Sequence, residues 1–310
     1  MSDLIDPTEP TSVRRALVTG ATGYIGSRVV EGLLAEGWQV HIVTRRSSSL
    51  NLLDEHLHRI AIHMHDGSMD RMLKIVTAAN PDVVYHLAAM TSSEHHWQDV
   101  DQMVNANIVF STQLLEAMFQ SGAKHVVNTE TFWQHGNDSD NFSPTCLYAA
   151  TKQAFRDILI YYAGTGRIKA ISLVLYDTYG PDDPRKKLLN FLRQAAQSEQ
   201  QIDMTPGEQI IDITHVNDVV NAYLRAGEML LSEKAGAVHT YAVTSGRRMM
   251  LKELVELIVR ETGISVRPRW GGKPYRTNEV MVPWVGKPLP GWQPKIDLVA
   301  GIRDVFKDLD

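Results

Sequence analysis

The stretch "LVTGATGYIGS" (17–27) decides the fold class. It joins a short apolar run to a helical pattern through a loop that contains Gly20, Gly23 and Gly26. Glycines at such a junction allow a tight turn and a close backbone approach to a pyrophosphate, which the helix N-terminus then binds through its N–H groups and dipole. The alternative is a tight turn with no ligand. We predict a dinucleotide-binding loop formed by Gly20, Thr22, Gly23, Tyr24, Ile25 and Gly26.

Around this loop, short apolar runs alternate with longer helical patterns. Such alternation predicts a parallel sheet covered by helices on both faces, and the nearly continuous apolar character of the runs agrees with strands buried on both sides. The fold class is therefore α/β, a Rossmann-type doubly wound parallel sheet. The predicted strands are 15–20, 39–44, 82–89, a run from 125, 169–176, one near 210 and 237–244. The predicted helices are 25–37, 69–79, 104–122, 147–164, 185–201, one ending near 231, and 251–263.

After Pro181 the pattern loosens, which predicts a smaller C-terminal substrate-binding lobe. We expect a flexible tail over 1–12 and a dinucleotide-binding domain over 13–180, with 210–246 returning to it. The segments 181–209 and 247–310 would form the lobe.

The composition is that of a soluble enzyme. The 310 residues are 44% hydrophobic and carry a net charge of -5, whereas a nucleic-acid binder is more often basic. No apolar run reaches the roughly 18 residues of a membrane span, and the N-terminus has no signal-peptide core. Because Cys146 is the only cysteine, no internal disulfide can form, which fits the cytoplasm. The histidines lack zinc-type spacing, so we expect no metal site.

The end of the second strand, "VTRRSSS" (43–49), distinguishes the two nicotinamide cofactors. NAD-binding proteins usually place an acid there to bind the ribose 2′-OH. This segment has no acid, and Arg45, Arg46 and Ser47 could instead bind a 2′-phosphate. The sequence favours NADP (NADPH). The alternative is NAD beside a solvated arginine pair.

Tyr148 and Lys152 are candidates for proton transfer. They are four residues apart in the helix predicted over 147–164, so they share one face. A phenol has a pKa near 10, and a neighbouring ammonium lowers it toward neutrality. Such pairs also arise by chance, so the assignment depends on the glycine loop that precedes them.

Taken in order, these motifs resemble the extended short-chain dehydrogenase/reductase family of the NAD-dependent epimerase/dehydratase type. Its motifs match "HDGSMD" (65–70), "HLAA" (86–89), "NIVFSTQLLEA" (107–117) and "LYAATK" (147–152). The resemblance implies that Tyr148 and Lys152 are catalytic and contact the cofactor. It also implies cofactor contacts from Asp66, Gly67, Leu87, Ala88, Ala89 and Asn107.

The strand that ends in "HVVNTETFWQHG" (125–136) carries the third catalytic candidate. Alignment with the family's strand ending implies Thr131 as the donor to the substrate oxygen, with Thr129 as the alternative; a threonine that merely caps the strand end is also possible. Trp133 and His135 would line a substrate pocket. The two positions after Thr131 are aromatic, so 4,6-dehydration is not expected. The segment "FWQH" resembles enzymes that reduce a 4-keto nucleotide sugar, such as the CDP-abequose synthase group.

Basic residues near the C-terminal lobe are candidates for binding the nucleotide diphosphate. Arg276 occupies a position where the family often has an arginine for the pyrophosphate, and Arg185 adds positive charge, although such a cluster can also be a solvated surface. Thr91 and Ser92 could contact the sugar. Asp177 departs from the family's asparagine, and its negative charge would disfavour a diphosphate.

Three functions fit these residues. The first is an NADPH-dependent ketoreductase acting on a 4-keto nucleotide-linked deoxysugar. The second is an NAD-dependent nucleotide-sugar epimerase, and the third is a dinucleotide sensor without catalysis. The resemblance also implies a homodimer that pairs through the helices predicted over 104–122 and 147–164.

Overall fold

The computed structural model describes residues 13–198, 201–232 and 238–309, so the predicted tail over 1–12 lies outside the described residues. A seven-stranded sheet runs in the order β10-β6-β5-β4-β1-β2-β3, and every neighbouring pair in it is parallel. The chain winds outward from β1 in both directions, which confirms the Rossmann-type prediction. The strands are β1 (Arg15–Thr19), β2 (Gln39–Thr44), β3 (Ile60–Met64), β4 (Val83–His86), β5 (His125–Thr131), β6 (Lys169–Leu175) and β10 (Val238–Val243).

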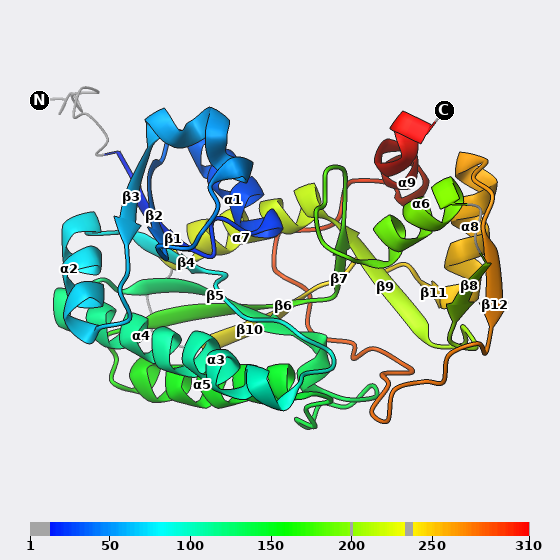
Figure 1. The fold of residues 1–310 in the computed structure, drawn as a ribbon. Helices are drawn as coiled ribbons and strands as arrows, with labels where there is room; N and C mark the ends of the chain where they lie inside the picture. The colour runs from blue at the N-terminus through cyan, green and yellow to red at the C-terminus, as the bar shows by residue number, and fades with distance from the viewer. Residues whose placement is uncertain (1–12, 199–200, 233–237, 310) are drawn as a thin grey trace, which may run out of the picture.

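Helices cover both faces of this sheet (Figure 1). One face carries α1 (Tyr24–Ala35) and α7 (Val216–Ser232), and the other carries α2 (Met69–Ala79), α4 (Phe110–Ser121) and α5 (Leu147–Gly164). Successive side chains of a strand point to opposite faces, so each central strand supplies both cores. This explains why the strands are apolar at almost every position rather than at alternate ones.

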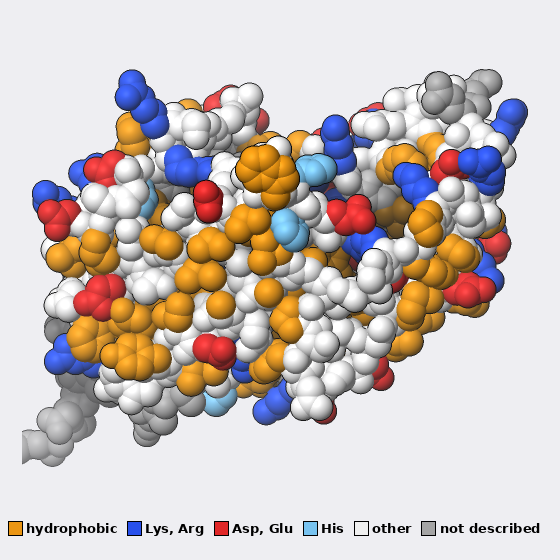
Figure 2. Space-filling view, turned by 60° about the horizontal axis from the view of Figure 1, so that its bottom comes forward, with side chains coloured by type: hydrophobic (Ala, Val, Ile, Leu, Met, Phe, Trp, Pro, Cys, Tyr) orange, Lys and Arg blue, Asp and Glu red, His pale blue; other side chains and the backbone are white. Residues whose placement is uncertain are grey.

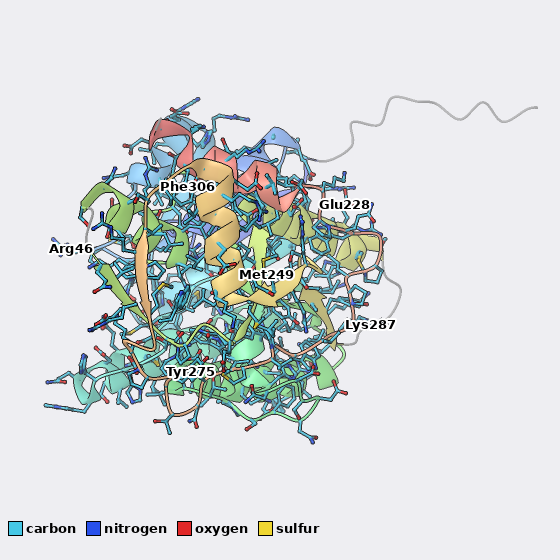
Figure 3. The ribbon with its side chains drawn as sticks, turned by 90° about the vertical axis from the view of Figure 1, so that its right-hand side faces the viewer. Arg46, Glu228, Met249, Tyr275, Lys287 and Phe306 are labelled. Carbon is cyan, nitrogen blue, oxygen red and sulfur yellow. The ribbon has the colours of Figure 1, made fainter. Side chains whose placement is uncertain are left out.

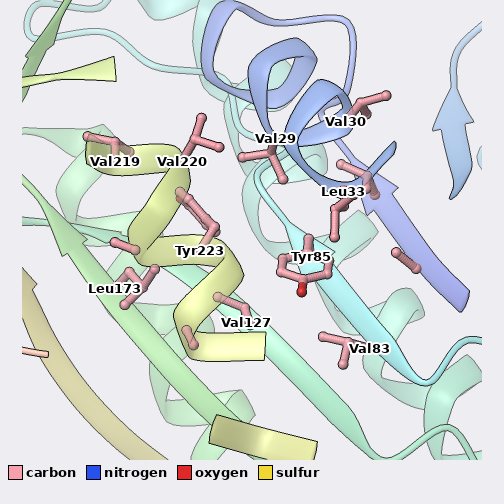
Figure 4. Close-up of a cluster of buried hydrophobic side chains, with 14 of the residues drawn as sticks. Val29, Val30, Leu33, Val83, Tyr85, Val127, Leu173, Val219, Val220 and Tyr223 are labelled. Atoms are coloured by element: carbon pink, nitrogen blue, oxygen red, sulfur yellow. The ribbon is translucent and has the colours of Figure 1, made fainter. Parts of the chain in front are cut away.

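The core under α1 and α7 fixes the register of the strands, because it determines which side chains of each strand are buried on which face. Ala16 and Val18 of β1 point into it, while Leu17 between them enters the opposite core, and all three are fully buried. Tyr85 of β4 lies between the two helices, near Val29 and Leu33 (Figure 4). Each such side chain contributes about 1.5–3 kcal/mol by burial, so a slip of one residue would be costly.

The helix predicted over 104–122 is interrupted, which corrects the prediction of one regular helix. It begins earlier as α3 (Val100–Val104), passes through the π-helical segment η3 (Asn105–Val109) and continues as α4. Within η3, Asn107 donates from Nδ2 to Met90 O at 3.0 Å and to Thr151 Oγ1 at 2.9 Å. Its Oδ1 accepts the Met90 N–H at 2.7 Å. The wider turn thus places one amide between the loop after β4 and α5.

A second region, formed by segments after residue 176, has its own apolar core (Figure 3, with Met249 and Phe306 labelled). It contains a three-stranded sheet of order β11-β9-β7 and a parallel pair of β12 with β8. Its elements are β7 (Asp177–Tyr179), α6 (Leu188–Ser198), β8 (Gln201–Met204), β9 (Ile210–His215), β11 (Arg248–Met250), α8 (Leu251–Thr262), β12 (Arg267–Trp270) and α9 (Leu298–Phe306).

The segment 210–246 divides between the two regions. Strand β10 and helix α7 return to the large sheet, whereas β9 pairs with β7 and β11. Several elements have no counterpart in the sequence-based assignment, and most of them are three to five residues long, which is too short for a clear periodic signal. They are β3, β7, β8, β11, β12, the nine-residue α9, and the 3-10 segments η1 (Asn51–Arg59), η2 (Trp97–Asp99), η4 (Phe132–Gln134) and η5 (Lys307–Leu309). The domain boundaries at 181 and 247 stay a prediction. Among the described helices, none is long and apolar enough to span a bilayer.

Candidate active site

The glycine loop is shaped by close contacts within the chain. Gly20 has a left-handed φ of 73°, and a Cβ there would lie 2.6 Å from the Ala88 nitrogen. A Cβ on Gly26 would lie 2.1 Å from the Gly20 oxygen, whereas one on Gly23 would meet no atom closer than 3.4 Å. Packing therefore accounts for Gly20 and Gly26 and leaves the surface at Gly23 open. Helix α1 also has no side-chain cap at its N-terminus, so the loop fits a pyrophosphate.

Tyr24 belongs to this loop but faces inward. Its hydroxyl donates to the Pro181 oxygen at 2.9 Å, and the Arg185 guanidinium lies 4.8 Å from the centre of its ring. Thr22 and Ile25 beside it are half-buried. The sequence placed Tyr24 among the cofactor contacts, and the structure gives its hydroxyl a partner in the segment that leads to the second region.

Arg45, Arg46 and Ser47 follow β2 and are exposed (Figure 3, where Arg46 lies at the edge of the molecule). Within the part of the chain that the structure describes, neither guanidinium has a hydrogen-bond or ion-pair partner. Two uncompensated cations beside the sheet edge form a favourable environment for an anionic group.

Asp66 and Gly67 form the turn between β3 and α2. Asp66 Oδ1 accepts from the Ser68 hydroxyl at 2.7 Å and from its backbone N–H at 2.9 Å, and these bonds hold the pKa of the Asp66 carboxyl below its usual range. Gly67 has a φ of 95°, and its oxygen accepts from Gln113 of α4 at 2.9 Å. The turn is exposed, so Asp66 is within reach of a ligand on this edge.

The segment after β4 lies against the glycine loop. Ala88 N–H donates to Thr19 Oγ1 at 3.3 Å, while Leu87 and Ala89 flank it. His86 just before is fully buried between Thr19 and Ser111, and burial lowers its pKa to about 3. Asn107, predicted as a cofactor contact, uses its amide to hold Met90 and Thr151. Its side chain thus positions this segment, and its contact with a cofactor stays a prediction.

Tyr148 and Lys152 lie one turn apart on α5, and both are buried. Burial raises the pKa of the Tyr148 phenol, and nearby Cys146 adds to the effect. Burial lowers the pKa of the Lys152 ammonium to about 8, against the opposing influence of Glu130. Without a ligand, the phenol is therefore protonated at neutral pH, and much of the lysine is charged.

Thr131 and Thr129 differ in what their hydroxyls do. Thr129 Oγ1 donates to the His86 carbonyl at 2.8 Å, so the Tyr223 hydroxyl must donate to it at 2.7 Å. Thr131 Oγ1 instead accepts the Trp133 N–H at 3.4 Å. Thr131 therefore retains its hydrogen for donation to another group, while the hydrogen of Thr129 is already used.

A cavity of about 200 Å³ opens where the ends of β5 and β7 meet the second region. Trp133 and Arg276, both predicted as substrate contacts, line it together with Asp177 and Lys187. The Trp133 ring meets the Tyr148 ring edge-on at 6.2 Å, so one cavity-lining residue lies next to α5. The centre of the same ring lies 5.4 Å from the Arg276 guanidinium and 5.9 Å from the Lys187 ammonium.

Both cations that line the cavity are paired with a carboxylate. Arg276 binds Glu279 through two hydrogen bonds of 2.6 and 2.9 Å. Lys187 lies 3.8 Å from Asp177. The acid Glu279 also lines the cavity and was missed from the sequence, although its place three residues after Arg276 is a signal for an ion pair.

His135 and Arg185, predicted as substrate contacts, do not line the cavity, and their roles stay a prediction. The His135 ring is buried and stacks on Trp284 at 3.9 Å, because a distant loop folds over it. Arg185 instead binds Asp183 at 2.7 and 2.8 Å. Thr91 is exposed and Ser92 donates to the Glu94 oxygen, and both also lie outside the lining. Among the described residues, no three His, Cys, Asp or Glu side chains are placed to hold a metal ion.

A family model for the NAD dependent epimerase/dehydratase family matches residues 16–240. The chain belongs to this family. Among curated members, the CDP-abequose synthase of Salmonella typhimurium is 28% identical over 304 residues, which cover 94% of this chain and 97% of that protein. The UDP-glucose 4-epimerase of Halalkalibacterium halodurans is 25% identical over 311 residues, covering 90% of each chain. Membership makes the chain an NAD(P)-dependent enzyme, as the sequence predicted.

Solved structures of family members share the fold. The UDP-glucose 4-epimerase of Stenotrophomonas maltophila with bound NAD and formylated UDP-arabinopyranose superposes with a TM-score of 0.83 at 22% identity, covering 95% of this chain and 97% of that chain. The UDP-glucose 4-epimerase of Thermotoga maritima with UDP-glucose gives a TM-score of 0.81 at 24% identity, covering 95% and 99%. At this level of identity the likeness concerns the architecture.

Proposed function

We propose that the protein reduces a 4-keto nucleotide-linked deoxysugar with NADPH, and that Tyr148 is the proton donor. The observation that carries the proposal is the pair of hydroxyls next to Trp133, which lines the cavity. The Tyr148 phenol is held protonated by burial, and the Thr131 hydroxyl keeps its hydrogen available. A protonated acid and a free donor suit a reaction in which negative charge develops on a carbonyl oxygen.

The chain's residues would divide the work as follows. The nicotinamide cofactor, when bound, supplies the hydride. Thr131 donates a hydrogen bond to the substrate oxygen, and Tyr148 delivers a proton to it. The Lys152 ammonium stabilises the tyrosinate that remains, and a buried charge acts over this short range because little water screens it.

The preference for NADPH is supported by the end of β2. Arg45 and Arg46 are exposed cations without partners in the described structure, and the segment has no acid to bind a ribose hydroxyl. Guanidinium groups bind phosphates through paired hydrogen bonds. Gly20, Thr22, Gly23, Ile25 and Gly26 would meet the pyrophosphate, with Asp66, Gly67, Leu87, Ala88 and Ala89 along the adjoining edge.

The substrate assignment is supported by the similarity to CDP-abequose synthases and by the cations of the cavity. Arg276 and Lys187 would bind the diphosphate, with Trp133 between them and the catalytic residues. Two aromatic residues follow Thr131, where a dehydratase would need an acid and a base for its proton transfers.

A sugar epimerase is the second candidate, because UDP-glucose 4-epimerases are also among the similar proteins. An epimerase oxidises and re-reduces its substrate, so it consumes no cofactor overall. The deciding measurement is the stoichiometry of NADPH loss against a CDP-linked 4-keto-6-deoxyhexose. One NADPH consumed per sugar supports reduction, whereas product formation without NADPH loss contradicts it.

We further propose a homodimer in the cytoplasm. Hydrophobic side chains gather on the face formed by α4 and α5 (Figure 2). On it Val109, Ile160 and Tyr161 are 42%, 46% and 69% exposed, which is unusual for large apolar groups in a monomer. A second copy packing against this face would bury them. Sedimentation of the protein and of an Ile160→Glu, Tyr161→Glu variant tests this: a monomer in both contradicts it.

A further inference from the structure

Gln134 is the last residue of η4 and is completely buried. Its Oε1 accepts the backbone N–H of Thr131 at 3.0 Å, and its Nε2 donates to Gln153 Oε1 at 3.1 Å. Gln153 in turn donates to Asp157 at 3.3 Å. One side chain thus links the end of β5 to the middle of α5, with both of its polar atoms hydrogen-bonded.

The two ends of this bridge are adjacent to the proposed reacting groups. Thr131 is the proposed donor to the substrate oxygen, and Gln153 directly follows Lys152 in α5. A second tie joins the same strand and helix one position away, where both oxygens of buried Glu130 accept from Arg156 at 2.9 Å. The strand and helix are therefore fixed to each other by two polar contacts close to Thr131.

The bridge also controls the orientation of the Thr131 hydroxyl. The turn η4 brings the Trp133 N–H to Thr131 Oγ1, and the bond from Gln134 closes this turn against Thr131. With its oxygen occupied by an N–H, the hydroxyl directs its hydrogen elsewhere. A hydroxyl without this contact rotates freely, and a small misplacement of a catalytic group can reduce rate by about 100-fold.

We infer that Gln134 is a positioning residue that holds Thr131 in register with Tyr148 and Lys152. The inference rests on the proposed role of Thr131 in ketone reduction. Gln134 itself lies beneath the turn and does not line the cavity. Of the proposed reacting groups, Thr131 is the one whose backbone it contacts directly, so we expect most of its effect on the reaction to pass through Thr131.

A double-mutant cycle tests this dependence. Gln134→Leu keeps the approximate shape and removes both hydrogen bonds. We expect kcat for NADPH-dependent reduction of a CDP-linked 4-keto-6-deoxyhexose to fall about 10- to 100-fold, with KM and the NADPH Kd changed by less than about twofold. In a Thr131→Val background, the same change should lower kcat by less than about twofold, because there is no hydroxyl left to orient.

Gln197→Leu, at an exposed position of α6, controls for the loss of a glutamine amide and should leave both backgrounds unchanged. Equal losses from Gln134→Leu in both backgrounds, or a loss that appears in NADPH Kd, would overturn the inference. If Gln134→Leu fails to fold, Gln153→Ala cuts the tie to α5 while keeping the bond to Thr131, and its kcat loss should likewise vanish with Thr131→Val. Absence of NADPH-dependent reduction by the starting protein would reject the proposed function itself. Normal turnover by Thr131→Val would remove the role of Thr131 and the inference with it, whereas a slow Thr131→Val beside a normal Gln134→Leu rejects only the inference.

Discussion

The two ends of the candidate site differ in whether their cations are paired with a carboxylate. At the dinucleotide end, Arg45 and Arg46 have no partner within the described residues. In the cavity of the second region, Arg276 and Lys187 each face a carboxylate. The first end offers its charge directly to an anion, whereas the second must exchange an internal partner for the ligand. Cofactor binding should therefore depend more strongly on its cations than substrate binding does.

The largest effect is expected from the residue between the two ends. Tyr148→Phe keeps the ring that packs against Trp133 and removes the proton, so kcat should fall about 10²–10⁴-fold. The Kd for NADPH should not change, since the neutral phenol carries no charge that could pair with the cofactor. Single-turnover loss of NADPH absorbance measures the step. Undiminished turnover would show that Tyr148 is not the proton donor and would contradict the proposed mechanism.

The burial of Lys152 should be measurable in the free energy of unfolding of the unliganded protein, without an assay of catalysis. The pKa of Lys152 falls from about 10.5 in the unfolded chain to about 8 in the folded protein, so the unfolded state binds more protons between these values. The unliganded protein should thus gain stability as pH rises from 8 toward 10.5. Lys152→Met should be more stable than the starting protein at pH 7, by about 1–3 kcal/mol, because no charge is buried.

Thermal melts at several pH values check this expectation, and Lys74→Met, on the exterior of α2, is the control. A Lys152→Met variant that is less stable at pH 7, or that keeps the full pH dependence, would mean that the ammonium is well solvated in the folded state.

The unpaired cations should set cofactor choice. If Arg45 and Arg46 bind a 2′-phosphate, NADPH binds at least about tenfold tighter than NADH, a difference of about 1.4 kcal/mol. Replacing both with Ala should erase the preference and leave the NADH Kd unchanged. Fluorescence titration measures the four constants. Equal affinities of the starting protein for NADPH and NADH would favour the epimerase. They would also mean that the unpaired arginines contribute no more to cofactor binding than the paired cations contribute to substrate binding.

The paired cation should matter less. Arg276→Ala should raise KM for the nucleotide sugar about three- to tenfold, because the arginine must leave Glu279 to bind a diphosphate and its net contribution is reduced. NADPH binding should be unaffected. Initial-rate kinetics measure the change, and Arg303→Ala, in a surface ion pair of α9, is the control. An unchanged KM would remove Arg276 from the binding site.

The sequence predicted best where the signal is local. Three glycines between a strand and a helix gave the loop, and a four-residue spacing placed Tyr148 and Lys152 on one buried face. Thr131 was identified by alignment, and its free hydrogen supports it over Thr129.

The sequence predicted least where partners come from distant segments. The sequence predicted His135 as a pocket residue, but its ring stacks on Trp284, which lies far away in the sequence. It predicted Arg185 as a substrate-binding cation, but Arg185 pairs with Asp183, two positions away. The family resemblance implied a cofactor contact for Asn107, and it gave no sign of the π-helical turn in which the Asn107 amide accepts the Met90 N–H. The surroundings of such side chains depend on burial and on contacts with distant segments, which local residue spacing does not indicate.

The inward-facing Tyr24 has a consequence for the order of events on the enzyme. Its hydroxyl holds Pro181, and the neighbouring Arg28 lies 3.4 Å from Asp182, so the first turn of α1 is fastened to the segment that leads into the substrate cavity. The same turn is the seat proposed for the cofactor pyrophosphate. A ligand at either site that alters these contacts would therefore change the affinity of the other site. Thermodynamic reciprocity then requires that whatever factor the dinucleotide contributes to sugar affinity, the sugar returns to the dinucleotide.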